Sequence, residues 1–423
     1  MDARNKKAEQ NVARGRSSDY DVARIRADFP ILSRTIYDKP LVYMDNGASA
    51  QKPRVVLEAI RKSYEEEYSN VHRGLHFLSN TATANYEAAR QAAANFINAP
   101  GVDEIIFTSN ATAAINLVAQ SFGSIQIQEG DEIVLSIMEH HSNIVPWHFH
   151  RERRGANLVW VPVEDDGSFS LEAFEKSLTD RTKMVAITHV SNVLGTIVPI
   201  KKIADICRGR NIPVLVDGSQ GAVHEPVDVQ VLGVDFYIFT GHKVYGPSGI
   251  GVLWAKMEHL EAMPPFMGGG EMIGEVHKDK VTYAAPPHRF EAGTPPIVQA
   301  IGLGAALTYM QSIGVENIKR HERDLAEYAQ KSLKKINSLR IIGEAPGKAS
   351  IISFEMQGVH PHDISTIIDR SGVAVRAGTH CAEPLLQRFG VTSTCRASLG
   401  MYNTREEIDI LVEALLKAED FFT

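Results

Sequence analysis

Short aliphatic runs alternate with helix-like segments over most of the chain, and this alternation constrains the fold more than any other feature of the sequence. Several runs are almost continuously apolar, which is typical of strands buried on both faces of a parallel sheet. Helical stretches such as 113–120 and 201–208 separate several of them. The pattern therefore predicts an α/β fold with a mostly parallel central sheet. The predicted strands are residues 104–108, 132–136, 158–163, 184–190, 214–217, 236–240 and 249–255.

The rhythm breaks between residues 256 and 300, where Pro-Pro pairs and a run of three glycines predict a long irregular stretch at a domain or subunit boundary. Beyond it, long amphipathic helices surround short strands at 350–355 and 374–376, which predicts a smaller α+β domain. In the last helix, Thr404 and Glu407 form a predicted capping box. Its predicted apolar stripe is Ile408, Leu411, Val412, Leu415 and Leu416.

Four segments follow from these changes in pattern. We expect a flexible tail (1–20), an N-terminal segment that joins the small domain (21–37), a large domain (38–305) and a small C-terminal domain (306–423). The N-terminal segment begins with a predicted short helix, residues 22–29, stopped by Pro30.

Charge and composition exclude several functional classes. The 423 residues carry a formal net charge of -7 without a long basic block, so the sequence predicts no nucleic-acid partner and no anionic-membrane surface. No apolar run approaches a membrane span and no apolar signal segment opens the chain, which predicts a cytoplasmic protein. The 3 cysteines, Cys207, Cys381 and Cys395, do not suggest a disulfide framework.

An acid and an amine follow two neighbouring predicted strands. Asp217 ends the strand 214–217, and Lys243 follows the strand 236–240. Ligands of open α/β sheets bind outside such carboxyl ends. Pyridoxal phosphate enzymes use this pair, because a lysine binds the cofactor as a Schiff base and an aspartate keeps its pyridine nitrogen protonated. A purely structural Asp–Lys pair is the alternative interpretation.

A segment that follows a predicted strand and opens a helix could hold a phosphate through backbone N–H groups and hydroxyls. It is residues 108–112, Thr-Ser-Asn-Ala-Thr, which lacks the Gly-Lys-Ser/Thr of a P-loop and could equally be an ordinary helix cap. The glycines of 246–251 precede no helix, so we reject a nicotinamide-binding interpretation.

Histidines gather near residue 140. Their spacing is not that of a zinc protease and no cysteine pairs support a zinc cluster, so we predict no metal site. One imidazole, His140, could instead stack on a pyridine ring and move protons. For His141, His148 and His150 we expect ordinary solvated side chains.

Cys381 lies in a Gly- and Pro-punctuated loop between Arg376 and Arg396. A thiol beside cationic groups is readily ionised to the nucleophilic thiolate. Two arginines also suit a substrate carboxylate. We expect Cys207, in an apolar helical pattern, and Cys395 to be buried structural thiols.

From about residue 21 to the C-terminus, the chain resembles the class V, fold type I pyridoxal phosphate enzymes, and most closely the SufS-type (group II) cysteine desulfurases. The resemblance rests on VHRG at 71–74, EHHSN at 139–143, HVSNVLGT at 189–196, DGSQ at 217–220, TGHK at 240–243, RFEAGTP at 289–295 and RAGTHCAEP at 376–384. It implies that pyridoxal 5′-phosphate is the cofactor, that L-cysteine is converted to L-alanine, and that the sulfur is carried as a persulfide for iron–sulfur cluster assembly. Selenocysteine lyase activity is the alternative.

The resemblance also assigns roles. Lys243 is implied as the Schiff-base lysine, Asp217 as the partner of the pyridine nitrogen, Gln220 as the partner of the ring hydroxyl, and His140 as the stacking acid/base. The implied phosphate-binding residues are Ala111, Thr112, Thr240 and His242, with Thr294 from a neighbouring subunit. Asn192 and Arg396 are implied to hold the substrate carboxylate with Arg376 close by, Cys381 to accept the sulfur, and His72 and Arg73 to lie near the mouth of the site.

Two departures from the family pattern remove no required group: Thr379 stands where many relatives have a histidine, and the phosphate loop reads Asn110-Ala111-Thr112 rather than Gly-Thr-Thr. The short Cys381 loop implies a separate sulfur-acceptor protein of SufE or SufU type and a downstream cluster scaffold. A phosphate site shared between chains implies a homodimer. A non-catalytic scaffold and a zinc hydrolase built on His140 and His141 are the alternatives from other classes.

Overall fold

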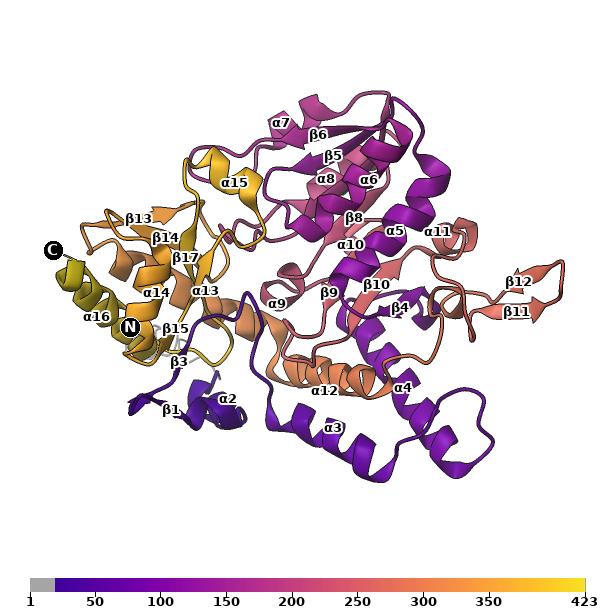
Figure 1. Ribbon diagram of the computed structural model, residues 1–423, viewed down its shortest axis with the longest axis horizontal. Helices are drawn as coiled ribbons and strands as arrows, with labels where there is room; N and C mark the ends of the chain where they lie inside the picture. Colours follow the sequence, from indigo (N-terminus) through magenta and orange to yellow (C-terminus); the bar gives the residue numbers. More distant parts are fainter. Residues whose placement is uncertain (1–19, 423) are drawn as a thin grey trace, which may run out of the picture.

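The computed structural model describes residues 20–422, and its centre is a 7-stranded sheet with the strand order β4-β10-β9-β8-β7-β5-β6 (Figure 1). β10 runs antiparallel to both of its neighbours, and the other strands run parallel. The prediction of a mostly parallel α/β sheet is confirmed, and each predicted strand is present with ends shifted by a few residues. The strands are β4 (Ile105–Thr108), β5 (Glu132–Ser136), β6 (Asn157–Val161), β7 (Thr182–Thr188), β8 (Val214–Asp217), β9 (Phe236–Thr240) and β10 (Gly251–Ala255).

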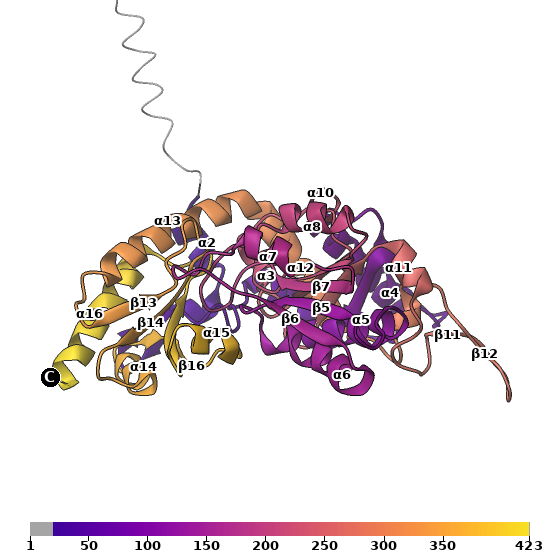
Figure 2. The same cartoon turned by 90° about the horizontal axis from the view of Figure 1, so that it is seen from above.

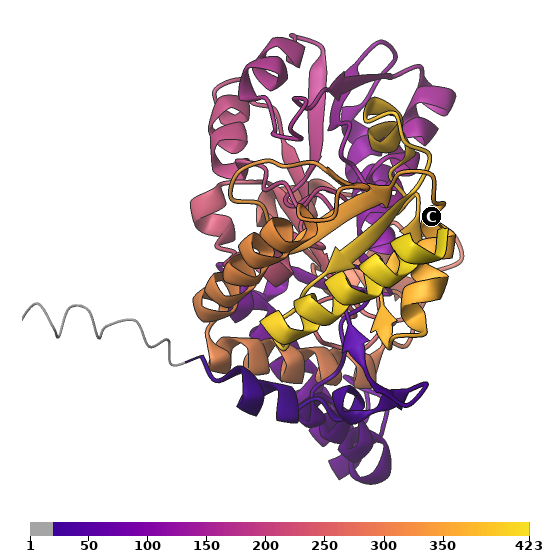
Figure 3. The same ribbon diagram turned by 90° about the vertical axis from the view of Figure 1, so that its left-hand side faces the viewer.

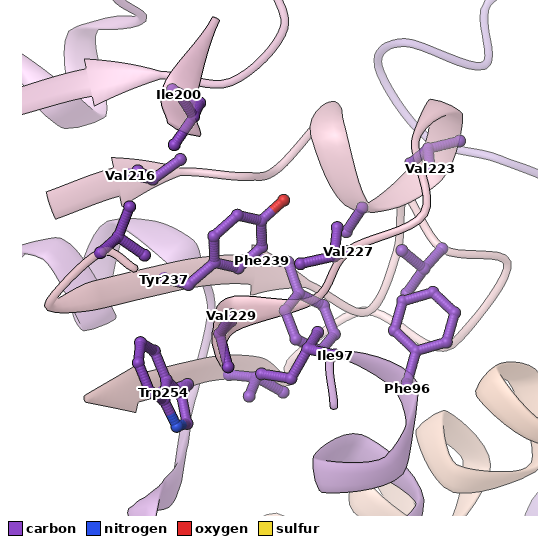
Figure 4. Close-up of a cluster of buried hydrophobic side chains, with 14 of the residues drawn as sticks. Phe96, Ile97, Ile200, Val216, Val223, Val227, Val229, Tyr237, Phe239 and Trp254 are labelled. Carbon is purple, nitrogen blue, oxygen red and sulfur yellow. The ribbon is translucent and has the colours of Figure 1, made fainter. Parts of the chain in front are cut away.

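Both faces of this sheet are buried, which explains the continuous aliphatic runs. Along β9, Phe236 and Ile238 pack into one hydrophobic cluster, whereas Tyr237 and Phe239 pack into another on the opposite face. The second face, which also carries Val216 and Trp254, is drawn in Figure 4. Helices α8 and α10 cover one side of the sheet and α5 and α6 the other (Figure 2). These helices are α5 (Ala111–Gln126), α6 (Val145–Arg154), α8 (Ile200–Arg208) and α10 (Val229–Leu232), with α7 (Leu171–Ser177) and α9 (Gly221–His224) between strands.

A second sheet of 4 antiparallel strands has the order β13-β14-β17-β16. Helices α13 and α16 lie side by side against it (Figure 3), and α13, α14 and α16 share one hydrophobic cluster with the sheet. The strands are β13 (Leu339–Ile342), β14 (Ile351–Met356), β16 (Arg376–Gly378) and β17 (Thr394–Ser398). The helices are α13 (Val315–Leu333), α14 (Pro361–Asp369), α15 (Glu383–Arg388) and α16 (Arg405–Phe422).

The predicted strands and the last helix of this region are largely confirmed. The strand predicted at 374–376 is divided between β15 (Val373–Ala374) and β16. The capping box is present, because the Thr404 N–H donates to the Glu407 carboxylate at 3.1 Å and the Glu407 N–H donates to the Thr404 hydroxyl at 3.4 Å. The prediction for Leu416 is wrong, since its side chain is 42% exposed at the solvent edge of the stripe.

The stretch predicted to be irregular between 256 and 300 contains more regular structure than expected. Helix α11 (Met257–Ala262) follows β10, and β11 (Ile273–Val276) pairs with β12 (Val281–Tyr283) in a hairpin that projects from the body (Figures 1 and 2). Beyond it, α12 (Ile297–Ile313) packs on α3 (Arg54–Glu66) and α4 (Phe77–Phe96). Among the described residues no single helix meets the length and apolarity of a membrane span; only α12 and α13 together do, across a 75° bend.

The N-terminal segment packs against the C-terminal part of the chain. Helix α2 (Val22–Ala27) is shorter than predicted, because Phe29 and Pro30 begin a separate 3₁₀ turn. The predicted tail lies outside the described residues except for Tyr20, whose hydroxyl donates to the Met401 carbonyl at 2.6 Å. Two short hairpin strands, β1 (Thr35–Ile36) and β2 (Lys39–Pro40), lead to β3 (Val42–Tyr43), which pairs with β15.

Candidate active site

A cavity of about 270 Å³ lies between the carboxyl edge of the large sheet and the four-stranded sheet. Residues from nine separate parts of the sequence reach it, and most of the predicted site residues are among them. The lining residues are Gly47, Ala48, Asn110, Ala111, Thr112, His140, Ser142, Asn192, Asp217, Ser219, Thr240, His242, Lys243, Arg376, His380, Cys381 and Arg396.

Asp217 and Lys243 share this cavity because their strands are neighbours in the sheet and run in parallel. The Asp217 carboxylate is buried and accepts a hydrogen bond from the Ser219 N–H at 2.9 Å. Burial lowers the pKa of Lys243 to about 8, against the opposing effect of Asp217, which favours the charged amine. An amine with this pKa is partly neutral near neutral pH, as a nucleophile or a proton acceptor must be.

His140 comes from the loop after β5 and presents a neutral imidazole. Its Nδ1 accepts a hydrogen bond from the Ser142 N–H at 3.1 Å, which orients the ring. Burial, together with the nearby Lys243, lowers the pKa of His140 to about 4. Behind it, the buried Glu139 carboxylate accepts from the Thr188 N–H and the Asn143 amide, at 3.0 and 2.7 Å. Burial raises the pKa of Glu139 to about 8.

One end of the cavity suits a phosphate. The first turn of α5 leaves backbone N–H groups without intrahelical partners, and Asn110 caps only that of Ala113, at 2.9 Å. Ala111 and Thr112, in the same turn, line the cavity with Thr240 and His242. The Thr112 hydroxyl lies 2.7 Å from that of Ser142. Unpaired N–H groups and hydroxyls at a helix N-terminus form a suitable site for a phosphate.

Two arginines also line the cavity. Arg376 and Arg396 are opposite each other on β16 and β17. Arg396 is buried, and its Nη1 donates to the Asn192 carbonyl at 2.9 Å, whereas its Nε has no hydrogen-bond partner among the described residues. A buried guanidinium with a free donor fits a carboxylate ligand. The Asn192 amide donates to the His380 carbonyl at 2.8 Å and so fixes the neighbouring loop.

Cys381 is the exposed cysteine of the described chain and lies at the mouth of the cavity. The loop that carries it has positive φ at His380 (54°) and Cys381 (56°), and the Cys381 carbonyl accepts from the His141 N–H at 2.9 Å. The expectation that the other two thiols are buried is confirmed. Burial raises the pKa of both Cys207 and Cys395 to about 12, which makes them unreactive.

Four predicted site residues do not line this cavity. Gln220 is buried beside it, with its amide donating to the Gly47 carbonyl at 2.7 Å. Thr294 lines a different cavity of about 340 Å³, together with Thr108 and Ser109. His72 and Arg73 pair with Glu87 and Glu271, at 2.8 and 2.9 Å. Within one chain Thr294, His72 and Arg73 are therefore separate from the cavity, whereas Gln220 lies next to it.

The flanking histidines differ from expectation. His141 is partly exposed but pairs with Glu383, and His148 is also partly exposed. For His150 the prediction of a solvated side chain is wrong, because α6 directs it into the core, where Nε2 lies 2.7 Å from the Ala119 carbonyl.

Sequence reasoning missed three residues that shape the site. Asp45 contacts both arginines, Ser142 orients His140 and Thr112, and Glu139 ties the ends of β5 and β7. Glu139 and Ser142 stand beside His140 in the sequence, so their place in the EHHSN motif was a usable signal. No sequence signal pointed to Asp45, because it is far in sequence from Arg376 and Arg396.

Taken together, these residues fit pyridoxal phosphate: an amine with a lowered pKa, a buried carboxylate facing the same cavity, an imidazole and free N–H groups at a helix N-terminus. The observation that carries the fit is that Lys243, the first turn of α5 and the two arginines all line one cavity.

The family model and the relatives that match this chain point to the same family. A family model described as "Aminotransferase class-V" matches residues 42–411. A "probable cysteine desulfurase" of Xylella fastidiosa (strain 9a5c) is 49% identical over 397 residues, which cover 94% of this chain and 95% of that protein. Another, from Streptomyces coelicolor, is 49% identical over 409 residues, which cover 95% and 98%.

Solved structures show the same fold. The cysteine desulfurase CsdA of Escherichia coli, in an S-sulfonic acid form, has a TM-score of 0.89 at 39% identity and covers 96% of this chain and 100% of its own. The apo cysteine desulfurase of Thermococcus onnurineus NA1 has a TM-score of 0.89 at 36% identity, with coverage of 95% and 98%. A C-DES mutant with glycine covalently linked to its PLP cofactor has a TM-score of 0.79 at 26% identity, with coverage of 92% and 98%.

Proposed function

The chain belongs to the aminotransferase class-V family, and from that premise we propose that it is a pyridoxal phosphate-dependent cysteine desulfurase of the SufS type, which converts L-cysteine to L-alanine and receives the sulfur on Cys381. One observation carries the proposal: a single cavity is lined by Lys243, Asp217, Arg396 and the exposed Cys381. The similarity to proteins named cysteine desulfurases supports the same activity.

The cofactor, when bound, supplies an electron sink for bonds at the substrate Cα. In the proposed arrangement Lys243 would bind it covalently, Asp217 would pair with its ring nitrogen, Gln220 with its hydroxyl, and His140 would stack on the ring. The first turn of α5 (Ala111, Thr112) would hold its phosphate, together with Thr240 and His242 and with Thr294 of a second chain.

The chain's own groups then perform the reaction on the substrate. Arg396 and Asn192 hold the α-carboxylate, which places the substrate between Lys243 and Cys381. Lys243, when free and neutral, moves the Cα proton, and the neutral His140 acts as a second acid/base. An S–S bond forms between Cys381 Sγ and the substrate sulfur as the Cβ–S bond breaks. The electron pair of that bond stays on the carbon, which takes a proton and leaves as alanine.

The sulfur remains on Cys381 as a persulfide, and an exposed persulfide can pass to another thiol. We propose an acceptor protein of SufE or SufU type, with iron–sulfur cluster assembly as the use of the sulfur and the cytoplasm as the location. The short loop that holds Cys381 supports this proposal, since it is fixed at both sides by His141 and Asn192 rather than free to reach far from the cavity.

A symmetric homodimer is part of the proposal. Leu75 and Phe77 are 99% and 79% exposed on the segment that also carries His72 and Arg73. Large apolar side chains this exposed, next to residues predicted to serve an active site, suit burial against a second copy. Phe77→Asp is expected to give a monomer by light scattering, while Tyr37→Asp, at an aromatic residue of the β1–β2 hairpin that is 53% exposed, is not. A dimeric Phe77→Asp protein with full activity would count against this interface.

The proposed activity is tested with the visible spectrum of the purified protein and an alanine assay in the same cuvette. L-cysteine should shift the cofactor band as alanine appears. Cys381→Ala should keep the band and stop alanine formation, whereas Cys207→Ala, which removes a buried thiol, should keep both. Absence of any band after cofactor reconstitution would refute the proposal. Selenide release from selenocysteine by Cys381→Ala would identify a second activity that does not need the thiol.

A further inference from the structure

Asp45 connects the two arginines of the cavity without lining it. Its carboxylate accepts from Arg376 Nε at 3.1 and 3.2 Å and from Arg376 Nη2 at 2.9 Å, which is a bidentate pair. Arg396 Nη2 lies 3.6 Å from the same carboxylate. The bidentate geometry commits Arg376 to Asp45, and the longer contact leaves Arg396 less strongly engaged.

The backbone around Asp45 fixes this arrangement. Asp45 is bridged to Ser398 on β17, and the Met44 N–H donates to the Ala374 carbonyl at 2.9 Å. The chain at Asp45 therefore lies alongside β15 and the end of β17, next to the paired strands that carry the two arginines. Gly47 closes the space on the other side, because a Cβ there would lie 3.4 Å from Arg396 Cζ. The backbone position of Asp45 is thus set by strand pairing, which directs its carboxylate to the two arginines.

The charges at this end of the cavity follow from the pairing. Two guanidinium groups and one carboxylate leave one net positive charge. The side chain of Arg396 is 3% exposed and retains an unpaired Nε, whereas that of Arg376 is 51% exposed and already paired. A single ligand carboxylate would neutralise the remaining charge, and a second anionic group would find Arg376 occupied.

We infer that Asp45 is a positioning residue that sets the charge selectivity of this site: by neutralising Arg376 it leaves Arg396 to hold one carboxylate, and it thereby selects monocarboxylate amino acids over acidic ones. The inference rests on the proposed function only in taking an amino acid as the ligand. It corrects the simpler expectation that both arginines serve the substrate carboxylate.

Asp45→Asn tests the inference, because it keeps the size of the side chain and removes its charge. Arg376 would then be free for a second carboxylate, so binding of L-aspartate relative to L-alanine should rise about tenfold, as expected for one unit charge acting over about 7 Å in a partly solvated site. Dissociation constants for both amino acids are measured on the holoenzyme by titration of the cofactor band. The ratio of the two constants is insensitive to a general loss of stability.

A matched control exists in Asp324, which forms a similar bidentate pair with Arg405 far from the cavity, at 3.2 and 2.6 Å. Asp324→Asn should leave the ratio unchanged. An unchanged ratio in Asp45→Asn, or the same change in Asp324→Asn, overturns the inference.

The double variant Asp45→Asn with Arg376→Gln keeps the net charge of the subsite and replaces the ion pair with a neutral one. Its ratio should return to within about twofold of the wild-type value, and it also provides the test if Asp45→Asn alone does not fold. A tenfold change that persists in the double variant would overturn the role of Arg376. If wild-type enzyme binds both amino acids but forms no alanine from L-cysteine, the proposed desulfurase activity fails while the selectivity test remains valid.

Discussion

The lowered pKa of Lys243 makes a quantitative prediction about its reactivity. With a pKa of about 8 rather than the 10.5 of an ordinary lysine, roughly 9% of the amine is neutral at pH 7 and about 91% at pH 9. Only the neutral amine reacts with a carbonyl, so its labelling rate should rise about tenfold over this range and level off above pH 9. A solvated lysine amine, with its ordinary pKa, would instead gain about a hundredfold and continue to rise.

The assay is reductive methylation of the apoenzyme with formaldehyde, followed by mass spectrometry of the peptide that carries Lys243. Peptides with exposed lysines such as Lys278 report how the reagent itself depends on pH. Asp217→Asn adds a second arm, because the Asp217 carboxylate favours the charged amine and its loss should move the midpoint below pH 8. A midpoint above about pH 9.5, or an upward shift in Asp217→Asn, would show that burial does not control this amine.

Two further predictions concern the framework that supports the site. Glu291→Gln should lower the free energy of unfolding by about 3 kcal/mol in guanidinium titrations of the holoenzyme, since it removes the buried carboxylate that pairs with the buried Arg90 guanidinium at 2.6 Å and leaves the less buried Glu87 as its charged partner. The control is Glu65, whose ion pair with Arg61 is exposed, so Glu65→Gln should hardly change the denaturation midpoint. Equal losses of unfolding free energy in Glu291→Gln and Glu65→Gln would contradict the argument. Gly218→Ala should lower the thermal midpoint by several degrees in a scanning experiment, because its Cβ would overlap the buried Tyr237 ring. An unchanged midpoint would show that the turn after Asp217 can move aside.

The large sheet could be predicted because its strands can be recognised locally. A strand buried on both faces needs apolar side chains at nearly every position, as in β8 and β9, and this pattern is visible in a few consecutive residues. The residues at the carboxyl ends of these strands were therefore predictable too. Asp217 and Lys243 lie where two neighbouring parallel strands end, and the structure brings them to one cavity.

The arginine end of the site could not be predicted in the same way. Asp45 meets Arg376 across 331 residues of sequence, through pairing of the two-residue strands β3 and β15. Strands this short carry no periodicity, and pairing between distant segments depends on the packing of the whole domain. The prediction of a solvated His150 was wrong for a related reason. A polar residue near the end of a helix does not indicate on which side of that helix the core lies.

The division of the site between two sheets has a consequence for how a substrate is recognised. Lys243, Asp217 and His140 are fixed by the large sheet and the loops that follow its strands, whereas Arg396 and the loop of Cys381 belong to the four-stranded sheet. At the cavity the chain around Asp45 connects the two sheets, because Asp45 pairs with both arginines of the four-stranded sheet and the Gly47 carbonyl accepts from the Gln220 amide, which follows β8. A ligand carboxylate on Arg396 therefore fixes the place of the substrate relative to both the amine and the thiol. A substrate that lacks this carboxylate loses the alignment of its sulfur with Cys381 as well as its binding energy, so cysteamine should fail in kcat and not in KM alone.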